Sequence, residues 1–218
     1  MWPNPTLDPP LSAEWIGELE FFSKVDRFLG TPIDQTVIGE DNKRHAMYLA
    51  RMRTEDGAST TVLVKLSVKY NADAHKILAE RDPPLAPALH YCAPVIGDMC
   101  IVVMEHLSAE SLHNVSLPLP TSALEVVKSD VSEALKLLHA QGLVFGDLRE
   151  QNVLYSPEGG GRALLVDFDG VGRDGEDRYS ACLNPYAGLC VRRLQIMEES
   201  HDDENFGRLL ERLSGYRL

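Results

Sequence analysis

The chain has 218 residues, of which 44% are hydrophobic and 25% charged, a composition that is ordinary for a soluble globular protein. This length is enough for one large domain or for two small lobes with a real core. The formal net charge of −12 argues against non-specific binding to nucleic acid or to an anionic membrane, although a local basic pocket could still bind phosphate.

Cysteine usage and the N-terminal residues bear on the compartment. The four cysteines include no Cys-x-x-Cys pair, which indicates free thiols in a reducing compartment. The first residues lack the basic region and apolar run of a signal peptide, and no apolar run approaches the roughly 20 residues that span a membrane. We therefore expect an intracellular, cytoplasmic protein.

The N-terminal segments predict an arm and a helix. Residues 1–11 carry four prolines, which favour an extended arm. In residues 12–30, Trp15, Leu19 and Phe22 recur at helical spacing, and a glycine stands where such a helix would end. This pattern predicts a helix that packs on the core.

The pattern then changes to short strands. Between residues 35 and 69, runs rich in β-branched and aromatic residues alternate with polar turns, which predicts an antiparallel meander. A helix is expected at residues 71–82 ("NADAHKILAERD"), ended by the prolines that follow. The sequence is apolar without a break from Met99 to Met104, as in a buried strand.

The second half predicts two helices and a hairpin. Residues 121–142 have an apolar stripe, capping-box spacing at Ser122 and Glu125, and a terminal glycine. The strands "NVLYS" and "ALLVDF" flank "PEGGGR", whose glycines are most simply a hairpin loop. A final helix is expected at residues 201–216.

Three polar residues surround this hairpin. Asn152 begins its first strand, Asp167 ends its second strand, and Asp147 lies on the preceding loop. Each alone is typical of a turn. Together, their oxygens suit Mg²⁺, which keeps few protein ligands and takes the rest from phosphates and water. An Asp beside such a pair is well placed to accept a proton from a hydroxyl.

These residues carry a resemblance. "GDLREQN" followed by "LLVDFD" resembles the catalytic loop and metal-binding segment of the protein kinase-like superfamily, H-R-D-x-x-x-x-N followed by D-F-G. The glycine before the aspartate is similar to the H-G-D form of aminoglycoside phosphotransferases. "GDLR…N…DFD" is most similar to compact fungal protein-kinase-like domains.

The resemblance implies an α+β, two-lobed kinase-like fold. It covers about residues 36–172, with an arm and helix expected at 1–35. The N-lobe, at 36–107, would hold an antiparallel sheet and one helix. The C-lobe, at 108–218, would be mainly helical and shortened, because no A-P-E-like segment follows and a full peptide-docking lobe does not fit.

Family roles then follow for individual residues. Asp147 would orient an acceptor hydroxyl and take its proton, and Arg149 would stabilise charge on the transferred phosphoryl group. Asn152 and Asp167 would hold Mg²⁺ against the phosphates of ATP. Lys65, at the end of "VLVK", would bind the α- and β-phosphates.

The remaining nucleotide contacts are also implied by the resemblance. Met104 would lie beside the adenine, and backbone groups from Glu105 to Leu107 would hydrogen-bond the base. Lys65 would pair with Asp73 or Glu80, two turns apart on one helix, and the similarity of "DAHKIL" to E-A-R-x-L favours Asp73. A surface carboxylate without this role is an alternative for either residue.

Several features depart from the family pattern. Before Lys65, "VIGEDNKRHAMY" has a single glycine in place of G-x-G-x-x-G, which predicts a shorter loop over the phosphates. Phe145 replaces the usual His, and Asp169 replaces the glycine of D-F-G, where it would cap a turn or add a metal oxygen. Asp202 or Asp203 would brace the catalytic loop, or simply stand at a helix start favoured by the helix dipole.

The resemblance implies an ATP- and Mg²⁺-dependent kinase that phosphorylates a hydroxyl of a protein or a small molecule. The alternative is a pseudokinase that acts as a nucleotide-binding or scaffold module. A metal-dependent hydrolase is a third hypothesis, but it gives Lys65 no role. The expected partners are a nucleotide and the acceptor, without nucleic acid or membrane.

Overall fold

A computed structural model describes residues 17–25, 46–54, 57–95, 99–184 and 186–215. The chain divides into two compact units, each described here by itself. The first unit comprises residues 1–67 and 89–106, and the second comprises residues 68–88 and 107–218. Among the helices in these ranges, none is long and apolar enough to cross a membrane.

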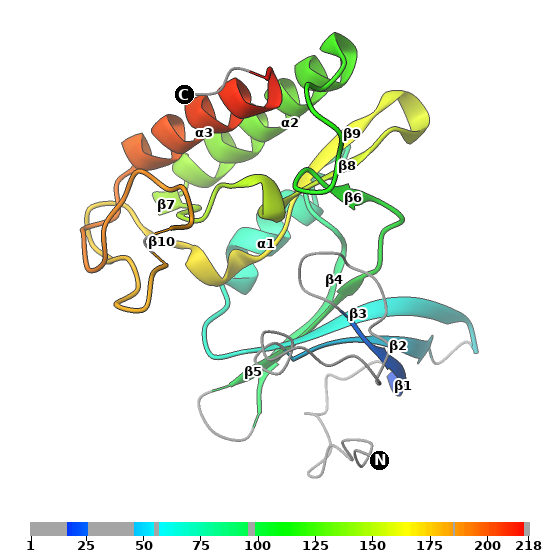
Figure 1. The fold of residues 1–218 in the computed structure, drawn as a ribbon. Coiled ribbons are helices and arrows are strands. Elements are labelled where there is room, and N and C mark those ends of the chain that lie inside the picture. The colour runs from blue at the N-terminus through cyan, green and yellow to red at the C-terminus, as the bar shows by residue number, and fades with distance from the viewer. Residues whose placement is uncertain (1–16, 26–45, 55–56, 96–98, 185, 216–218) are drawn as a thin grey trace. The chain divides into compact units, whose positions relative to one another are not determined.

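The first unit is built on one antiparallel sheet. Its five strands lie in the order β1-β2-β3-β5-β4 (Figure 1). They are β1 (Gly17–Lys24), β2 (Ala46–Thr54), β3 (Ser59–Ser67), β4 (Leu89–Pro94) and β5 (Cys100–Glu105). The inward side chains form one core, and strand β5, which has a neighbour on each side, is buried from Ile101 to Met104, as its unbroken apolar run predicts.

The helix expected at residues 12–30 is wrong over the part that is described. Residues Gly17–Lys24 form strand β1, which pairs antiparallel with β2. Along β1 the burial alternates: Leu19 and Phe21 pack on the core, while Phe22 is 52% exposed. The helical spacing placed Phe22 on the buried side. The same residues also fit the two-residue alternation of a half-buried strand, and the structure follows that alternation.

The segment before β2 holds residues that the sequence singled out. The strand expected at 35–40 and Gly39 lie outside the described residues. The shorter phosphate-covering loop expected from "VIGEDNKRHAMY" falls largely in the same stretch, so it stays a prediction.

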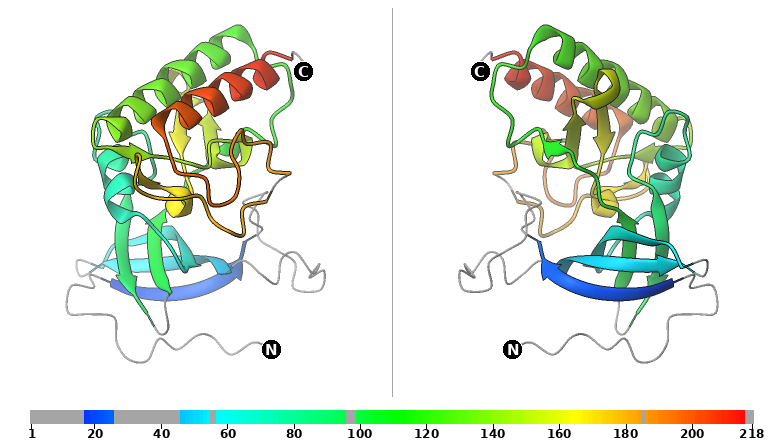
Figure 2. Two further views of the ribbon diagram at one scale, coloured as in Figure 1. Left: turned by 90° about the vertical axis from the view of Figure 1, so that its left-hand side faces the viewer. Right: turned by 90° about the vertical axis from the view of Figure 1, so that its right-hand side faces the viewer.

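The second unit combines three helices with two small antiparallel sheets. The helices are α1 (Ala72–Ala79), α2 (Thr121–His139) and α3 (Glu199–Leu213), and α2 and α3 run side by side in both views of Figure 2. One sheet pairs β7 (Leu143–Val144) with β10 (Gly172–Arg173), and the other has the order β6-β8-β9. Its strands are β6 (Glu110–Ser111), β8 (Val153–Ser156) and β9 (Arg162–Leu165).

Helix α2 confirms the expected stripe but not its cap. Val127, Val131, Leu135 and Leu138 are buried against the core of this unit. The helix begins at Thr121 after Pro120, and no side chain caps it, so the capping box expected from Ser122 is wrong. The preceding proline already sets a backbone angle that suits a helix start.

The predicted hairpin is confirmed. β8 and β9 pair in register from Val153–Leu165 to Ser156–Arg162, joined by the short 3₁₀ turn η3 (Glu158–Gly160). The amide of Leu165 donates to the carbonyl of Leu85 at 2.9 Å, which ties the hairpin to the segment after α1.

Helix α1 lies where residues 71–82 predict a helix, but it ends earlier. Asn71 caps it, because its Oδ1 accepts the amide proton of Ala74 at 2.9 Å. The amide of Asn71 donates in turn to the carbonyl of Phe168 at 3.2 Å. The helix closes at Ala79, and Glu80 is its C-cap residue.

The fully buried His75 on α1 packs in an aromatic cluster of the second unit. Its ring stacks on Phe168, with centroids 4.6 Å apart and planes 10° apart. Nε2 lies 2.7 Å from the carbonyl of Pro87, so Nε2 carries the proton and Nδ1 accepts from the hydroxyl of Tyr70, also at 2.7 Å. Burial lowers the pKa of His75 from 6.5 to about 4.

This histidine predicts an acid-dependent loss of stability. Because the folded pKa lies below the unfolded one, its contribution is complete above pH 6.5 and is lost as the pH falls to about 4. The free energy of unfolding should fall by about 3 kcal/mol over this window through His75 alone. Urea unfolding at several pH values should show a shallower dependence in His75→Leu than in the wild type. His113→Gln, at an exposed position, should keep the wild-type slope, and equal slopes in all three proteins would contradict the assignment.

Candidate functional site

The residues that the sequence assigns to the nucleotide are divided between the two units. Lys65 lies on β3 with Met47 and Val102 as its neighbours on β2 and β5. Met104 is buried on β5, and Glu105 is the exposed last residue of that strand. These three residues belong to the first unit, and their nucleotide roles stay predictions.

The other expected contacts belong to the second unit. Asp73 is exposed in the first turn of α1, Glu80 is exposed at its C-cap, and Leu107 is half-buried after β5. The choice between Asp73 and Glu80 as the partner of Lys65 stays a prediction. A carboxylate in the first turn is favourable for the helix in any case.

The predicted base lies in a tight polar cluster on the loop between β7 and β8. The guanidinium of Arg149 contacts both carboxylate oxygens of Asp147. Its Nε lies 2.9 Å from Oδ1, and its Nη2 lies 3.1 Å from Oδ2. Nδ2 of Asn152 donates to Oδ2 of Asp147 at 2.7 Å and to its backbone carbonyl at 2.8 Å. The sequence predicted that these residues converge, but not that Arg149 binds Asp147 directly.

The hairpin brings the second metal candidate to the same place. The pair Val153–Leu165 is in register, and the amide of Val166 donates to the carbonyl of Asn152 at 3.0 Å. Asp167 follows with a φ of 69°, a left-handed conformation that Asp tolerates better than most residues. The short 3₁₀ turn η4 (Phe168–Gly170) then leads away, with Asp169 inside it.

Electrostatics keep the Asp147 carboxyl sensitive to its neighbours. Burial is the largest effect and raises the pKa of Asp147, and the negative charge of Asp167 raises it further. The charge of Arg149 and the hydrogen bonds from Asn152 and Arg149 oppose this shift. A carboxylate balanced in this way can exchange a proton when a ligand changes the local charge.

The donor set fits a metal that is shared with a ligand. Both hydrogen bonds of Asn152 use Nδ2, so its amide oxygen is the atom that could coordinate a cation. With Asp167 this makes two oxygen-bearing ligands. Among the described residues, no group of three or more His, Cys, Asp or Glu could hold an ion by themselves. Mg²⁺ is the cation that such a pair suits, because it takes its other ligands from phosphates and water.

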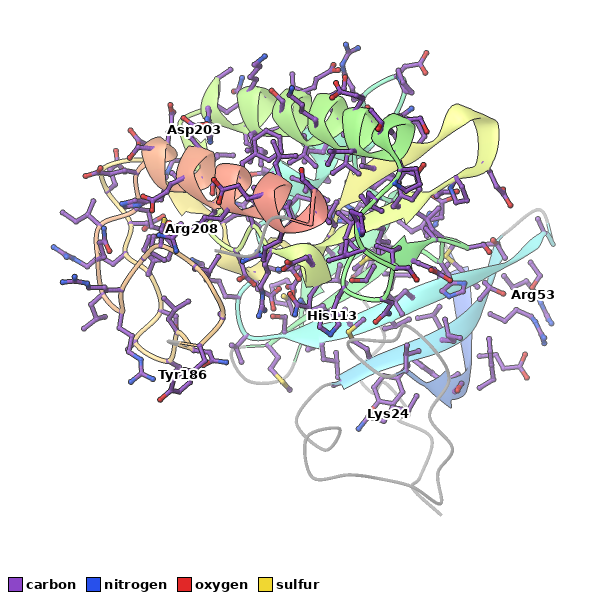
Figure 3. All side chains as sticks on the ribbon, turned by 45° about the horizontal axis from the view of Figure 1, so that its top comes forward. Lys24, Arg53, His113, Tyr186, Asp203 and Arg208 are labelled. Carbon is purple, nitrogen blue, oxygen red and sulfur yellow. The ribbon has the colours of Figure 1, made fainter. Side chains whose placement is uncertain are left out.

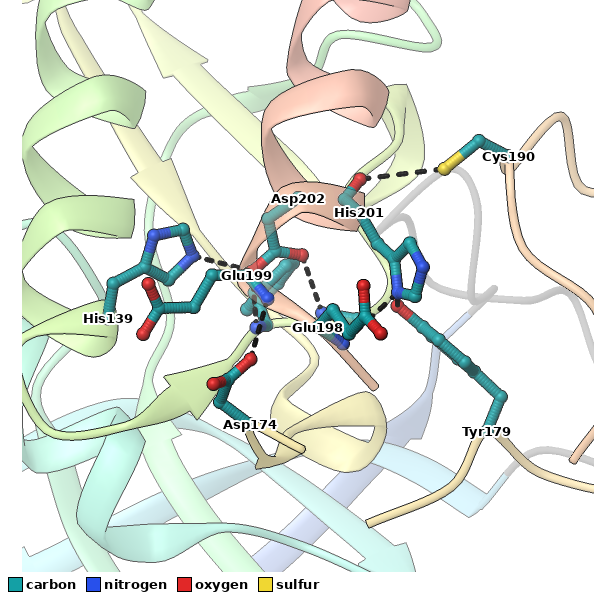
Figure 4. A network of polar contacts seen from close by, with 10 residues as sticks. His139, Asp174, Tyr179, Cys190, Glu198, Glu199, His201 and Asp202 are labelled. Atoms are coloured by element: carbon teal, nitrogen blue, oxygen red, sulfur yellow. Dashed lines mark hydrogen bonds and ion pairs between the residues drawn. The ribbon is translucent and has the colours of Figure 1, made fainter. Parts of the chain in front are cut away.

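Asp202 on α3 fixes the backbone that precedes Asp147 (Figure 4). Its fully buried carboxylate accepts the amide protons of Phe145 at 2.7 Å and Gly146 at 2.9 Å. Nε2 of His139 lies 3.1 Å from the same carboxylate. The sequence left Asp202 and Asp203 open, and the structure selects Asp202, because Asp203 is exposed.

His139 was not singled out by the sequence. Burial alone would lower its pKa, but the hydrogen bond and charge of Asp202, with Glu199 and Asp203, raise it above the usual value. A protonated His139 neutralises the buried carboxylate, which lowers the cost of keeping that charge away from water.

The contacts of Gly146 and Phe145 explain why these residue types precede Asp147. Gly146 has a φ of 77°, and a Cβ there would lie 2.6 Å from the Met197 side chain and 2.7 Å from the carbonyl oxygen of Gly170. Phe145, in place of the family His, packs edge-on against Phe168 with centroids 5.8 Å apart. The loop before Asp147 is thus held by packing as well as by hydrogen bonds.

A second contact from α3 was also not expected. Arg212 forms a two-point ion pair with Glu150, two residues before Asn152, and one of its bonds joins Nη2 to Oε2 at 3.1 Å. Asp202 and Arg212 therefore hold the loop on both sides of Asp147. The sequence had named Asp202 or Asp203 as a brace, but Arg212 follows ten residues after Asp202 without a pattern that predicts its contact.

Comparisons with known proteins agree with this geometry. No protein-family model matches the chain. Protein kinase PINOID 2 of Arabidopsis thaliana is 33% identical over 99 residues, which are 43% of this chain and 18% of that protein. Serine/threonine-protein kinase WAG1 of the same plant is 27% identical over 113 residues, 50% of this chain and 23% of that protein.

A solved structure gives the wider match. The Cydia pomonella granulovirus kinase PK-1 superposes with a TM-score of 0.65 at 18% identity, over 91% of this chain and 69% of that one. The fold is kinase-like. The α+β class expected from the sequence is confirmed. The chain spans less than a quarter of the length of these plant kinases.

The Asp202 contacts predict a large and specific stability effect. In Asp202→Asn, an NH₂ group replaces one carboxylate oxygen. This group is a donor and cannot accept the hydrogen bond that a backbone N–H group gives to that oxygen in the wild type. We expect a loss of about 3 kcal/mol in the free energy of unfolding, because buried donors lose their acceptor. Asp203→Asn, one residue away and exposed, should change it by about 0.5 kcal/mol or less. Equal losses in urea unfolding would contradict the role given to Asp202.

Two glycines with positive φ provide a matched test of the packing. Gly142, with a φ of 65°, has nothing within 4 Å of an added Cβ, so Gly142→Ala should cost only about 1 kcal/mol of backbone strain. Gly146→Ala adds a clash with a backbone carbonyl and should cost about 3 kcal/mol or more. Thermal unfolding of the two variants should separate them clearly, and similar midpoints would show that the loop can move aside.

Proposed function

We propose that this chain is an ATP- and Mg²⁺-dependent phosphotransferase that transfers the γ-phosphoryl group to a hydroxyl. The observation that carries the proposal is the cluster of Asp147, Asn152 and Asp167, held on one side by the buried carboxylate of Asp202. A turn that needed only polar caps would not place the buried Asn152 together with the half-buried Asp147 and Asp167.

Each residue then has a physical role. Asp147 orients the acceptor hydroxyl and accepts its proton, a task that its balanced carboxylate suits. Asn152 and Asp167 hold Mg²⁺, which neutralises charge on the phosphates when it is bound. Arg149 leaves one oxygen of Asp147 and stabilises the transferred group, since guanidinium binds phosphoryl oxygens in two-point geometry. Lys65 binds the α- and β-phosphates, and Met104 to Leu107 contact the adenine.

The acceptor is a protein or a small molecule. The relative named as a serine/threonine-protein kinase favours a protein hydroxyl. The glycine of the "GDLR" loop favours a small molecule and supports the aminoglycoside phosphotransferase likeness, whereas the likeness to fungal protein-kinase-like domains favours a protein. We place the functional lobes at 36–107 and 108–218, and the protein in the cytoplasm.

One observation favours the alternative of a catalytically impaired scaffold. Both oxygens of Asp147 are engaged by Arg149. An acceptor hydroxyl must displace one of these contacts before it can reach the carboxylate. If Arg149 never leaves, the chain binds nucleotide without turnover.

The test is ATP turnover with Mg²⁺, read as ADP release and as label on the chain or on added acceptors. Asp147→Asn should lower kcat by about 10²- to 10⁴-fold, because general base catalysis is lost. Asp167→Asn should abolish the Mg²⁺-dependent part of the thermal shift caused by ATP. Asp203→Asn is the matched control and should behave as wild type.

The outcomes separate the hypotheses. Turnover that depends on Asp147 and Asp167 supports the kinase. Binding of ATP–Mg²⁺ without turnover with any acceptor supports the scaffold. Neither binding nor turnover, with Asp167→Asn indistinguishable from wild type, would show that the cluster is only a polar hairpin end.

A further inference from the structure

The segment between β10 and α3 differs in charge from the rest of the chain. Residues 178–197 contain Arg178, Arg192 and Arg193 but no Asp or Glu, whereas the whole chain carries a net charge of −12. All three arginines are exposed. A local positive surface favours a negatively charged partner.

The two ends of this segment are hydrogen-bonded to each other, and its buried side chains pack on the second unit. Its two ends pair through hydrogen bonds from the amide of Tyr179 to the carbonyl of Gln195 at 3.0 Å and from Met197 to Asp177 at 2.9 Å. The buried side chains of Tyr179, Val191 and Met197 pack with Val144 of β7. The outward side chains are therefore carried by an ordered support, which reduces the entropy lost when a partner binds.

Apolar groups accompany the positive charge on this loop. Tyr186 is 92% exposed near its tip, where Figure 3 labels it, and Leu194 and Ile196 are 57% and 37% exposed. Arg178 and Ile196 form an antiparallel bridge, so their side chains lie on the same face. Nη1 of Arg178 also donates to the carbonyl of Leu194 at 2.9 Å, which keeps the guanidinium beside these apolar side chains.

The acidic residues at the base of the loop are engaged with backbone groups. Asp177 accepts the amide proton of Arg173 at 2.8 Å, and Asp174 accepts that of Glu199 at 2.9 Å. Glu198 caps α3 through a reciprocal bond with His201. These carboxylates bind groups of the chain itself. They therefore offset the positive charge of the three arginines less than a count of acidic residues implies.

We propose that residues 178–197 form a docking surface for an acidic polypeptide segment that also carries apolar side chains. The arginines select the charge, and Tyr186, Leu194 and Ile196 bind the apolar side chains. Exposed aromatic and arginine side chains are the types that contribute most at protein interfaces. The surface serves a kinase or a scaffold equally, so the proposal does not rest on phosphotransfer.

A polypeptide fits these features better than RNA does. Two of the three apolar groups are aliphatic and offer no stacking plane for a base. Because successive side chains of an extended peptide point to opposite faces, a repeat of two acidic and two apolar residues places both kinds of side chain against the loop at once.

The test is fluorescence polarisation, without nucleotide, using a labelled peptide of Glu-Glu-Leu-Leu repeats, called the Glu–Leu peptide. A peptide of Lys-Lys-Leu-Leu repeats, the Lys–Leu peptide, and labelled polyuridylate are the comparison probes. The Glu–Leu peptide should bind the wild type, and the affinity should fall as salt is raised. Arg192→Glu should weaken binding about fivefold or more, and Tyr186→Ser about tenfold.

Both positions are suited to substitution. Within the described part of the chain, the Arg192 and Tyr186 side chains make no hydrogen bond or ion pair, so neither change should unfold the loop. Arg53→Glu, an exposed arginine of the first unit, makes the same charge change elsewhere and should leave binding intact. Tighter binding of the Lys–Leu peptide or of polyuridylate, or equal losses in Arg53→Glu and Arg192→Glu, would overturn the proposal.

Discussion

The buried carboxylate of Asp202 is the contact on which the second unit depends. It accepts hydrogen bonds from two consecutive backbone N–H groups, those of Phe145 and Gly146, and it pairs with His139 from α2. Two helices and the loop that precedes Asp147 are thereby joined at one fully buried point. A buried charge is costly unless its hydrogen bonds are complete, so this arrangement admits one position of the loop and excludes looser ones.

The consequences extend in both directions along the chain. Once the loop is fixed, Phe145 contacts Phe168, and Phe168 supports His75 on α1. Asn71, at the start of α1, also bonds to the backbone of Phe168, so the helix and the Asp167 segment position each other. On the other side, Arg212 holds Glu150. The geometry of Asp147, Asn152 and Asp167 therefore results from packing around them rather than from the polar residues themselves.

The site and the docking surface share this support. Met197 closes the base of the arginine-bearing loop and also lies against Gly146, directly before Asp147. A partner held by residues 178–197 would thus bear on the same part of the second unit that carries the predicted base. Whether Asp147 transfers protons depends on the contact with Arg149, which is the one polar pairing in the cluster that a ligand must rearrange.

The sequence by itself determined the elements whose signals are local. The stripe of α2, the β8–β9 hairpin and the spacing of Asp147, Asn152 and Asp167 could all be predicted, because period, turn chemistry and motif are carried by neighbouring residues. The sequence-based prediction was wrong at β1. Leu19 and Phe22 fit a helical period, but pairing with β2 makes this segment a strand with two-residue alternation. Only the tertiary structure distinguished Asp202 from Asp203, revealed His75, His139 and Arg212, and placed Arg149 on Asp147. These contacts join residues far apart in the chain, or depend on which side chain is buried, and both are decided when the helices pack.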